Sequence, residues 1–376
     1  MEQGRLGLIV NPIAGLGGRV GLKGSDGLEV QHRARELGAE PLAQERAAEA
    51  LESLRKLPVE LLTPPAEMGE AVARRCGLNP RLIPTESLPT ISPRVTTGDE
   101  TRRAAQAMQV AGVDLILFAG GDGTARDIYD AVGSDFPVLG IPAGVKIHSA
   151  VFGLTPRRAG ELAADLLLGK HTRLHEAEVL DLDEAAYRED RIVTRLYGYL
   201  KIPYRREYVQ NQKVSTPAGD AVQAQAIASE VVGRMRPDQA YLLGPGTTTR
   251  AVAERLGLPK TLVGVDIIAR DGVLSMDVGE RQILEMLEKR PLGIIVTPIG
   301  GQGFLFGRGN QPLSPEVIRR VGQHNILVIS PTSKIVALRG QPLHVDSGDP
   351  DVDSMLSGYV EVITGYREKL IYRVSA

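Results

Sequence analysis

Residues 113–128, VDLILFAGGDGTARDI, decide the fold of this chain. The first seven of them form a nearly continuous apolar run, which is typical of a parallel strand buried on both faces. Gly120, Gly121 and Gly123 follow, and glycine allows a ligand to approach the bare backbone closely. A helix is expected from Thr124, so the stretch predicts a strand, a glycine turn and a helix N-terminus that together attract an anion.

Asp122 lies in the middle of these glycines, where a carboxylate would repel a bare phosphate group. In the functional interpretation, Asp122 binds Mg²⁺, directly or through water, or accepts a proton from a hydroxyl group beside the phosphates. In the local interpretation, Asp122 caps the following helix or serves as a turn residue. The residue type alone leaves both interpretations open.

The composition narrows the class of protein. The chain has 376 residues, enough for two domains, and its net charge of −2 predicts neither a nucleic-acid nor a membrane partner. Cys76 is its single cysteine, so an internal disulfide and a multi-cysteine metal site are excluded. Because the first residues lack a signal-peptide core and no apolar run approaches ~20 residues, we expect a cytoplasmic protein.

Strands and helices alternate over residues 1–172, which predicts an α/β fold with an N-terminal Rossmann-like domain. In such a domain, helices wrap a parallel sheet, and the carboxyl ends of the strands lie at one edge. We expect its strands at residues 6–10, 59–63, 113–119 and 136–141.

Two further turns follow predicted strands of this first domain. The first strand runs into NPIAG, where Asn11 and Gly15 are candidate contacts for nucleotide phosphates. The strand after the central motif runs into PAGVK, where Gly144 and Lys146 are candidates, because a lysine can act as a point charge on phosphate. The alternatives are a plain connection at NPIAG and a solvated Lys146.

Residues 173–376 are expected to form a second, mixed α/β domain with β-rich portions. A predicted strand at residues 239–243 runs into the turn GPGTT and then a helix, which is another candidate anion site. Its candidate phosphate-binding residues are Gly244, Gly246, Thr247 and Thr248. A further glycine-rich stretch, GGQGFLFGRGN, occupies residues 300–310. For this stretch and for GPGTT, the alternative to ligand binding is a tight turn at the end of a strand. The last predicted strands can pair either within this domain or with the sheet of the first domain.

Five segments carry a family resemblance: NPIAGLGGRVGLKG, FAGGDGTARDIYDAV, GIPAGVK, LGPGTTTRAVAE and TPIGGQGFLFGRGNQ. Together they resemble the ATP-NAD kinase-like branch of the NAD kinase and diacylglycerol kinase superfamily, which includes the acetoin-catabolism protein X group. The likeness to that branch covers nearly the whole chain. The likeness to established NAD kinases is limited to the first domain, chiefly GGDGT.

The resemblance implies transfer of a phosphoryl group from ATP, or from polyphosphate, to a small-molecule hydroxyl. The leading acceptor is the 2′-hydroxyl of NAD, which would give NADP, with Mg²⁺ as cofactor and nucleotides as partners. Asp122 would be the catalytic residue, as base or through Mg²⁺. Gly120, Gly121, Gly123 and Thr124 would bind the phosphates.

One departure from the family pattern leaves the acceptor open. NAD kinases carry a downstream Asn-Glu pair that grips the nucleotide ribose, whereas Asn211 and Asn325 are not followed by glutamate here. The alternatives are a lipid kinase, which the missing membrane-binding segment disfavours, and a non-catalytic regulatory protein that binds a nucleotide or a sugar phosphate. By analogy with related kinases, we expect a homo-oligomer.

Overall fold

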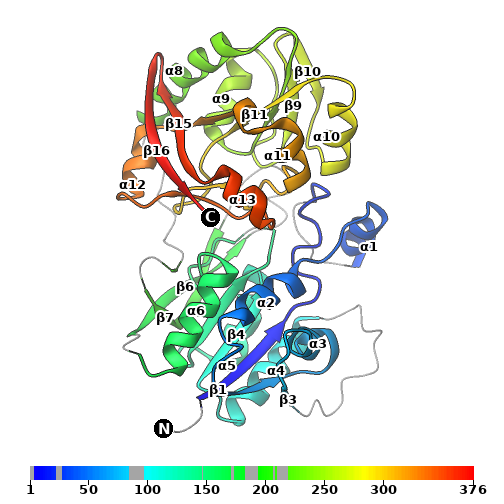
Figure 1. Cartoon of the computed structure of the whole chain (residues 1–376), viewed down its shortest axis with the longest axis vertical. Coiled ribbons are helices and arrows are strands. Elements are labelled where there is room, and N and C mark those ends of the chain that lie inside the picture. Colours follow the sequence, from blue (N-terminus) through cyan, green and yellow to red (C-terminus); the bar gives the residue numbers. More distant parts are fainter. Residues whose placement is uncertain are drawn as a thin grey trace.

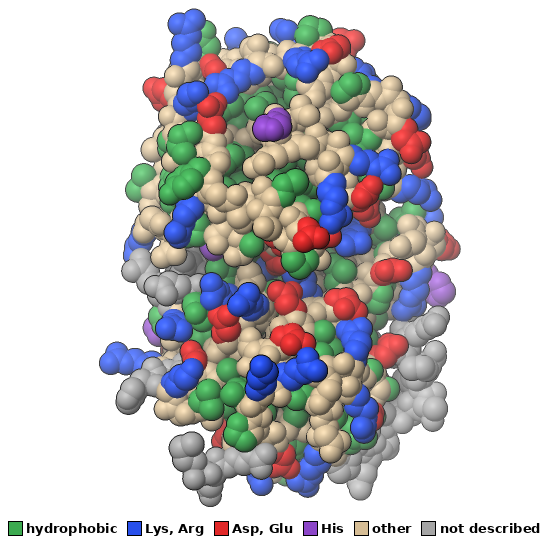
Figure 2. All heavy atoms as spheres, in the orientation of Figure 1, with side chains coloured by type: hydrophobic (Ala, Val, Ile, Leu, Met, Phe, Trp, Pro, Cys, Tyr) green, Lys and Arg blue, Asp and Glu red, His purple; other side chains and the backbone are tan. Residues whose placement is uncertain are grey.

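The computed structural model folds into two domains, drawn one above the other in Figure 1. It describes residues 4–22, 28–83, 97–145, 147–170, 173–182, 194–205, 208–209 and 219–376. Lys146 and Asn211, singled out above, lie outside the described residues. Within the described part, every helix is too short or too polar to traverse a lipid bilayer. Figure 2 shows acidic and basic side chains interspersed over both domains on one face of the molecule.

The first domain is built on five parallel strands in the order β3-β2-β1-β4-β5. They are β1 (Gly4–Val10), β2 (Val59–Thr63), β3 (Arg81–Leu82), β4 (Leu115–Gly120) and β5 (Val138–Pro142). Every residue of β4 is buried, as its apolar run predicts. The strands run upward in Figure 1, so their carboxyl ends face the second domain. The Rossmann-like sheet expected from the sequence is confirmed.

Helices cover this sheet in two packed pairs, α2 with α6 and α4 with α5. The helices of the domain are α1 (Leu28–Glu36), α2 (Ala43–Glu52), α3 (Glu70–Arg75), α4 (Gly98–Val110), α5 (Asp122–Val132) and α6 (Pro156–Leu167). Local sequence sets their ends: the Thr155 hydroxyl caps α6 by accepting the N–H of Arg158 at 3.2 Å. The alternation of strand and helix places all three glycine turns at the same edge of the sheet.

The hairpin formed by β6 (Arg173–Leu182) and β7 (Thr194–Tyr204) belongs to the first domain. The rings of Tyr129 on α5 and Tyr197 on β7 lie 5.7 Å apart. Inward side chains of the hairpin join the first hydrophobic core: Ala177, Val179, Leu200 and Ile202. The described hairpin and Val209 thus pack with the first domain, although the division expected between residues 172 and 173 would assign them to the second.

The second domain contains a nine-stranded mixed sheet in the order β10-β9-β8-β11-β13-β15-β16-β14-β12. The strands are β8 (Ala240–Leu243), β9 (Asp266–Ala269), β10 (Gly272–Ser275), β11 (Leu292–Val296), β12 (Phe304–Phe306), β13 (Ile326–Ile329), β14 (Leu343–Val345), β15 (Gly358–Gly365) and β16 (Glu368–Ser375). Because the last strands pair inside this sheet, their return to the first domain is not observed. The mixed α/β character of this domain is confirmed.

Successive side chains of β8 and β11 enter different hydrophobic cores, one on each face of this sheet. Leu242 and Ile294 pack with α10 (Glu280–Leu287) and α11 (Pro315–Val321). Leu243 and Ile295 pack with α8 (Gly219–Arg234) and α9 (Thr247–Arg255). The two remaining helices are α12 (Thr332–Ala337) and α13 (Pro350–Leu356). Helices therefore cover both faces, as in the first domain.

Candidate functional site

Three turns converge at the carboxyl edge of the first sheet. The Gly120 carbonyl accepts the backbone N–H groups of Ala143 and Gly144, each at 3.0 Å. Gly15 adopts a φ of +81°, and a Cβ there would lie 2.5 Å from the Ala143 carbonyl oxygen. Glycine is required at this position because both the backbone angle and the close approach exclude a side chain. The structure thus brings NPIAG, GGDGT and PAGVK together.

Asn11 and Thr124 hold the first two of these turns in register. The Asn11 amide donates to the Thr124 hydroxyl at 3.0 Å, and its carbonyl oxygen accepts the N–H of Ile13 at 3.2 Å. Thr124 is buried. Their expected contact with phosphate stays a prediction; in this structure their side chains bond to each other.

The Asp122 carboxylate is held by backbone N–H groups of the loop after β5. Its two oxygens accept the N–H of His148 at 2.8 Å and the N–H of Ser149 at 2.9 Å. The residue that caps α5 is Gly121, and no side chain bonds the helix start, so the capping interpretation of Asp122 is wrong. The loop amides fix the carboxylate in one orientation.

The carboxylate retains capacity for further contacts. His148 Nδ1 lies 3.3 Å from one Asp122 oxygen, and the Asp122 side chain keeps 11% of its surface exposed. An ionised carboxylate offers about four lone-pair sites, and two are taken by the loop amides. The remaining ones can contact a metal ion or a hydroxyl group.

A metal ion at this position would draw most of its ligands from elsewhere. Among the residues that the structure describes, no three His, Cys, Asp or Glu side chains are grouped so as to hold a metal. Mg²⁺ is commonly bound by one or two carboxylates together with water and substrate phosphates. Asp122 can supply the carboxylate of such a site. A single carboxylate is too few ligands for a site made of protein side chains alone.

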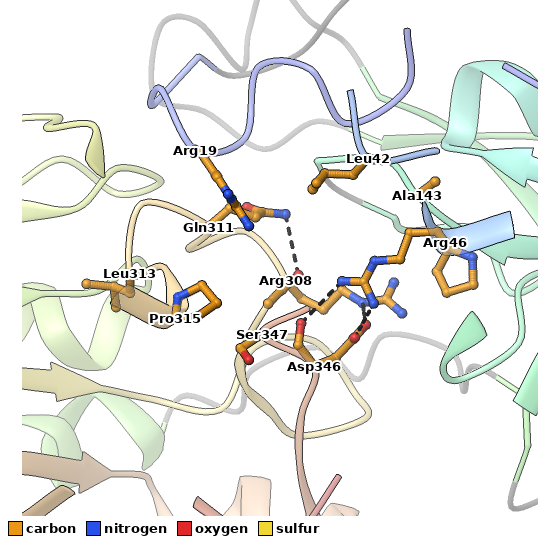
Figure 3. Close-up of a pocket in the computed structure, with 13 residues that line it drawn as sticks. Arg19, Leu42, Arg46, Ala143, Arg308, Gln311, Leu313, Pro315, Asp346 and Ser347 are labelled. Carbon is orange, nitrogen blue, oxygen red and sulfur yellow. Dashed lines mark hydrogen bonds and ion pairs between the residues drawn. The ribbon is translucent and has the colours of Figure 1, made fainter. Parts of the chain in front are cut away.

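A pocket lies between the two domains, next to the end of β5 (Figure 3). Arg46 and Arg308 converge on Asp346 from different domains, while Arg19 and Gln311 lie together on the opposite side. The polar and glycine residues of its lining are Arg19, Arg46, Gly144, Gly307, Arg308, Gln311, Asp346 and Ser347. The lining contains three guanidinium groups and one carboxylate, so it favours an anion.

The three arginines differ in how well they are neutralised. Arg46 hydrogen-bonds Asp346, whereas Arg308 Nε lies 3.8 Å from the same carboxylate. Arg308 also donates to the Leu154 carbonyl at 2.8 Å. The Arg19 side chain forms no hydrogen bond or ion pair with any residue within the described ranges. Arg46 also lies 3.7 Å from the Glu49 carboxylate, so Arg19 and Arg308 are the less neutralised guanidinium groups of the pocket.

The pKa values of Arg308 and Arg46 are shifted in opposite directions. Burial lowers the pKa of Arg308 to about 10, and the charge of Arg46 adds to that lowering, while Asp346 and then Asp122 oppose it. Although burial opposes it, Asp346 raises the pKa of Arg46 above the ordinary arginine value. A buried guanidinium that lacks a full counter-charge gains from an anionic ligand.

The loop after β5 connects this pocket to Asp122. Gln311, from the second domain, donates to the Val145 carbonyl at 2.6 Å. Gly144 lines the pocket, and His148 and Ser149 bind the Asp122 carboxylate. The two features therefore share one short segment of chain.

The candidates in GPGTT form a second group, at the junction of β8 and α9. Gly246 has a φ of +124° and precedes the helix, and Thr247 is exposed. The hydroxyl of Thr249, which the sequence did not single out, donates to the carbonyls of Gly244 and Gly246 at 2.6 and 2.9 Å. Thr248 is buried in the first turn of α9.

The pocket arginines were missed from the sequence, although one signal was available. Arg46 lies on the same helical stripe as Ala43, Ala47 and Ala50, all fully buried. A charged residue on a buried stripe requires a partner. That partner, Asp346, is 300 positions away, and no local pattern could identify it.

Two family models match the chain. One, described as the ATP-NAD kinase N-terminal domain, matches residues 6–171. The other, described as the ATP-NAD kinase C-terminal domain, matches residues 237–374. A search of curated proteins gives no match.

Proposed function

The chain belongs to the ATP-NAD kinase family, and we propose that it transfers a phosphoryl group from ATP to the 2′-hydroxyl of NAD. The observation that carries this proposal is the Asp122 carboxylate, oriented by two loop amides beside an arginine-lined pocket. Phosphoryl transfer depends mainly on positioning and charge neutralisation, which these two features supply.

In the proposed reaction, Asp122 orients the acceptor hydroxyl and accepts its proton. A bond forms between the hydroxyl oxygen and the γ-phosphorus, and the bond from that phosphorus to the bridging oxygen breaks. ADP leaves with the electron pair of the broken bond. Arg308 and Arg19 are the groups of the pocket that can neutralise phosphate charge, since Arg46 is committed to Asp346.

Asp122 is also the residue that would hold Mg²⁺, together with phosphate oxygens and water. When bound, Mg²⁺ would neutralise charge on the transferring group. The residues of this chain would keep their roles: the amides of His148 and Ser149 hold the carboxylate, and the arginines face the phosphates.

The test is formation of NADP from NAD, ATP and Mg²⁺, followed by an NADP-specific dehydrogenase. We expect Asp122→Asn to lower the rate by about 10²–10⁴-fold, the range attributed to a positioned general base. The matched control is Asp130→Asn, because Asp130 is an exposed carboxylate on the same helix and accepts a bond from the Tyr197 hydroxyl at 2.9 Å. This control should retain the wild-type rate.

Two outcomes would reject parts of the proposal. Equal rates for wild type and Asp122→Asn would remove Asp122 from the reaction. Nucleotide binding without NADP formation, with either ATP or polyphosphate as donor, would reject NAD as the acceptor. The regulatory alternative, a protein that binds a nucleotide or sugar phosphate without turnover, would then be favoured.

A further inference from the structure

The Asp122 carboxylate has a third contact, to the ring of His148, which the proposed reaction does not use. The backbone N–H and the ring of His148 approach the same oxygen, Oδ2, the N–H at 2.8 Å and Nδ1 at 3.3 Å. The other oxygen, Oδ1, accepts the N–H of Ser149 at 2.9 Å. The two oxygens of this carboxylate therefore have different surroundings.

The protonation of the ring follows from its partner. An ionised carboxylate only accepts hydrogen bonds, so Nδ1 has to carry the proton in this contact. In a neutral imidazole such a hydrogen bond sets the tautomer, which leaves a lone pair on Nε2. The side chains of His148 and Asp122 are only 15% and 11% exposed, so water competes weakly for this contact.

The ring changes which oxygen of Asp122 is open to a ligand. Each carboxylate oxygen offers about two lone pairs. With the two backbone N–H groups alone, each oxygen would keep one lone pair free, and the two oxygens would be interchangeable. The His148 ring takes the second lone pair of Oδ2. Among the described residues, Oδ1 receives no donor besides the Ser149 N–H, so the free position is on Oδ1.

The backbone that carries His148 is anchored without help from the ring. The fully buried Ser149 hydroxyl accepts the Leu180 N–H at 2.9 Å and donates to the Leu180 carbonyl at 3.3 Å. The Ala150 N–H donates to the Glu178 carbonyl at 2.8 Å. Both partners lie on β6, so the hairpin holds this loop in place. Removal of the ring should therefore leave the two loop amides on Asp122, and its effect can be measured separately from theirs.

We propose that His148 is a positioning residue of the kinase reaction. Its imidazole donates from Nδ1 to Asp122 Oδ2, so that Oδ1 is the oxygen that meets the acceptor hydroxyl and accepts its proton. In this role His148 acts through the carboxylate. The effect on turnover rests on the proposed function, whereas the proton on Nδ1 is a property of the protein alone.

The first measurement needs no substrate. Protein labelled with ¹⁵N at histidine is examined by NMR at alkaline pH, where a free imidazole is neutral. The signals lost in His148→Asn identify His148 among the six histidines of the chain. We expect its proton on Nδ1. A proton on Nε2, or one shared equally between the two nitrogens, would overturn the proposal whether or not the protein forms NADP.

The second measurement compares two variants of nearly equal shape. In His148→Asn an amide donor lies close to the position of Nδ1, whereas His148→Leu has a methyl group there. We expect His148→Leu to lower kcat for NADP formation by about 10–100-fold at unchanged KM, because a misplaced catalytic group can cost ~10²-fold while the binding groups are untouched. His148→Asn should retain most of the wild-type kcat, and both variants should keep a Tm close to that of wild type.

The matched control is His175→Leu, which should keep the wild-type kcat. His175 is an exposed histidine on β6, and its ring lies 4.7 Å from that of Tyr204. A wild-type kcat in His148→Leu would overturn the positioning role, and so would an equal loss in His148→Leu and His148→Asn. If the wild type itself forms no NADP, the proposed function fails together with the role in turnover, while the NMR measurement still decides the contact with Asp122.

Discussion

The molecule contains the same local design twice, once in each domain. GGDGT joins β4 to α5 and GPGTT joins β8 to α9, and in both the residue before the helix is a glycine with no side-chain cap. The first helical residue differs: Asp122 in α5 and Thr247 in α9. The first turn carries a fixed carboxylate, suited to a metal ion or a hydroxyl proton, and the second leaves helix N–H groups for an anion. The first helical residue thus sets the chemistry that each turn supports, although the backbones differ, with a φ of −123° at Gly121 and +124° at Gly246.

The largest expected effect comes from making the first turn resemble the second. Asp122→Thr removes the carboxylate and leaves the N–H groups of His148 and Ser149 without their acceptor. We expect NADP formation to fall by about 10²–10⁴-fold, while nucleotide binding, measured by titration, persists. If Asp122→Thr turned over at the wild-type rate, the two turns would be equivalent and the comparison would fail.

A pH titration measures how the burial of His344 in the second domain affects the stability of the protein. Burial lowers the pKa of His344 from 6.5 to about 4, and the charges of Arg158 and Arg308 add to this. Between those values the unfolded chain binds the proton and the folded chain does not. Stability should therefore fall as the pH drops from about 6.5 to about 4, by about 3 kcal/mol.

The measurement is chemical denaturation across that pH range. His344→Gln should flatten the dependence, because the residue that titrates differently in the two states is gone. The control, His324→Gln, changes an exposed histidine in the same domain and should keep the wild-type slope. An unchanged slope in His344→Gln would assign the acid sensitivity to other groups.

A smaller effect is expected at the arginine pocket, which serves the first turn only. Arg19→Gln removes a cation with no ion pair among the described residues, so the Tm should not change. The KM for ATP should rise by about tenfold, as expected for one lost contact to a charged group. Arg33→Gln, on the exposed face of α1, is the control. A wild-type KM in Arg19→Gln would place the phosphates of ATP elsewhere.

The smallest effect comes from making the second turn resemble the first. Thr247→Asp places a carboxylate at the first position of α9, as Asp122 is at the first position of α5. The charge should stabilise the helix N-terminus by about 0.3–1 kcal/mol, seen as a slightly higher Tm. The added charge should repel any pyrophosphate that binds at the start of α9, which titration measures. Unweakened pyrophosphate binding would show that α9 does not face the anion.

The sequence predicted those parts of the fold that short-range patterns control. The strand expected at residues 59–63 has the bounds observed, because an apolar run marks it locally. The turn at GGDGT and its partners NPIAG and PAGVK were likewise placed together, because parallel strands end at one edge.

The errors all concern interactions between distant segments. Alternation identified β6 and β7 as strands, but only packing reveals that Val179 and Leu200 enter the first core. The sequence could not decide between the two interpretations of Asp122, because its oxygens accept N–H groups from a loop 26 and 27 positions away. The buried hydroxyl of Thr297, which has no hydrogen-bond partner within the described ranges, is equally invisible in sequence, since nothing near it predicts burial without a partner.

The pairing of Arg46 with Asp346 has a consequence for how the molecule moves. Further hydrogen bonds cross the same interface: the Glu280 N–H donates to the Arg19 carbonyl at 2.9 Å, and the side chains of Arg308 and Gln311 donate to carbonyls of the first domain. Parting the domains would break all of these contacts together, including the ion pair of Arg46 with Asp346, whose side chains are at most 12% exposed. A hinge motion that opens the two domains is therefore disfavoured. Ligands should exchange through rearrangement of the surrounding loops while the domains stay in contact.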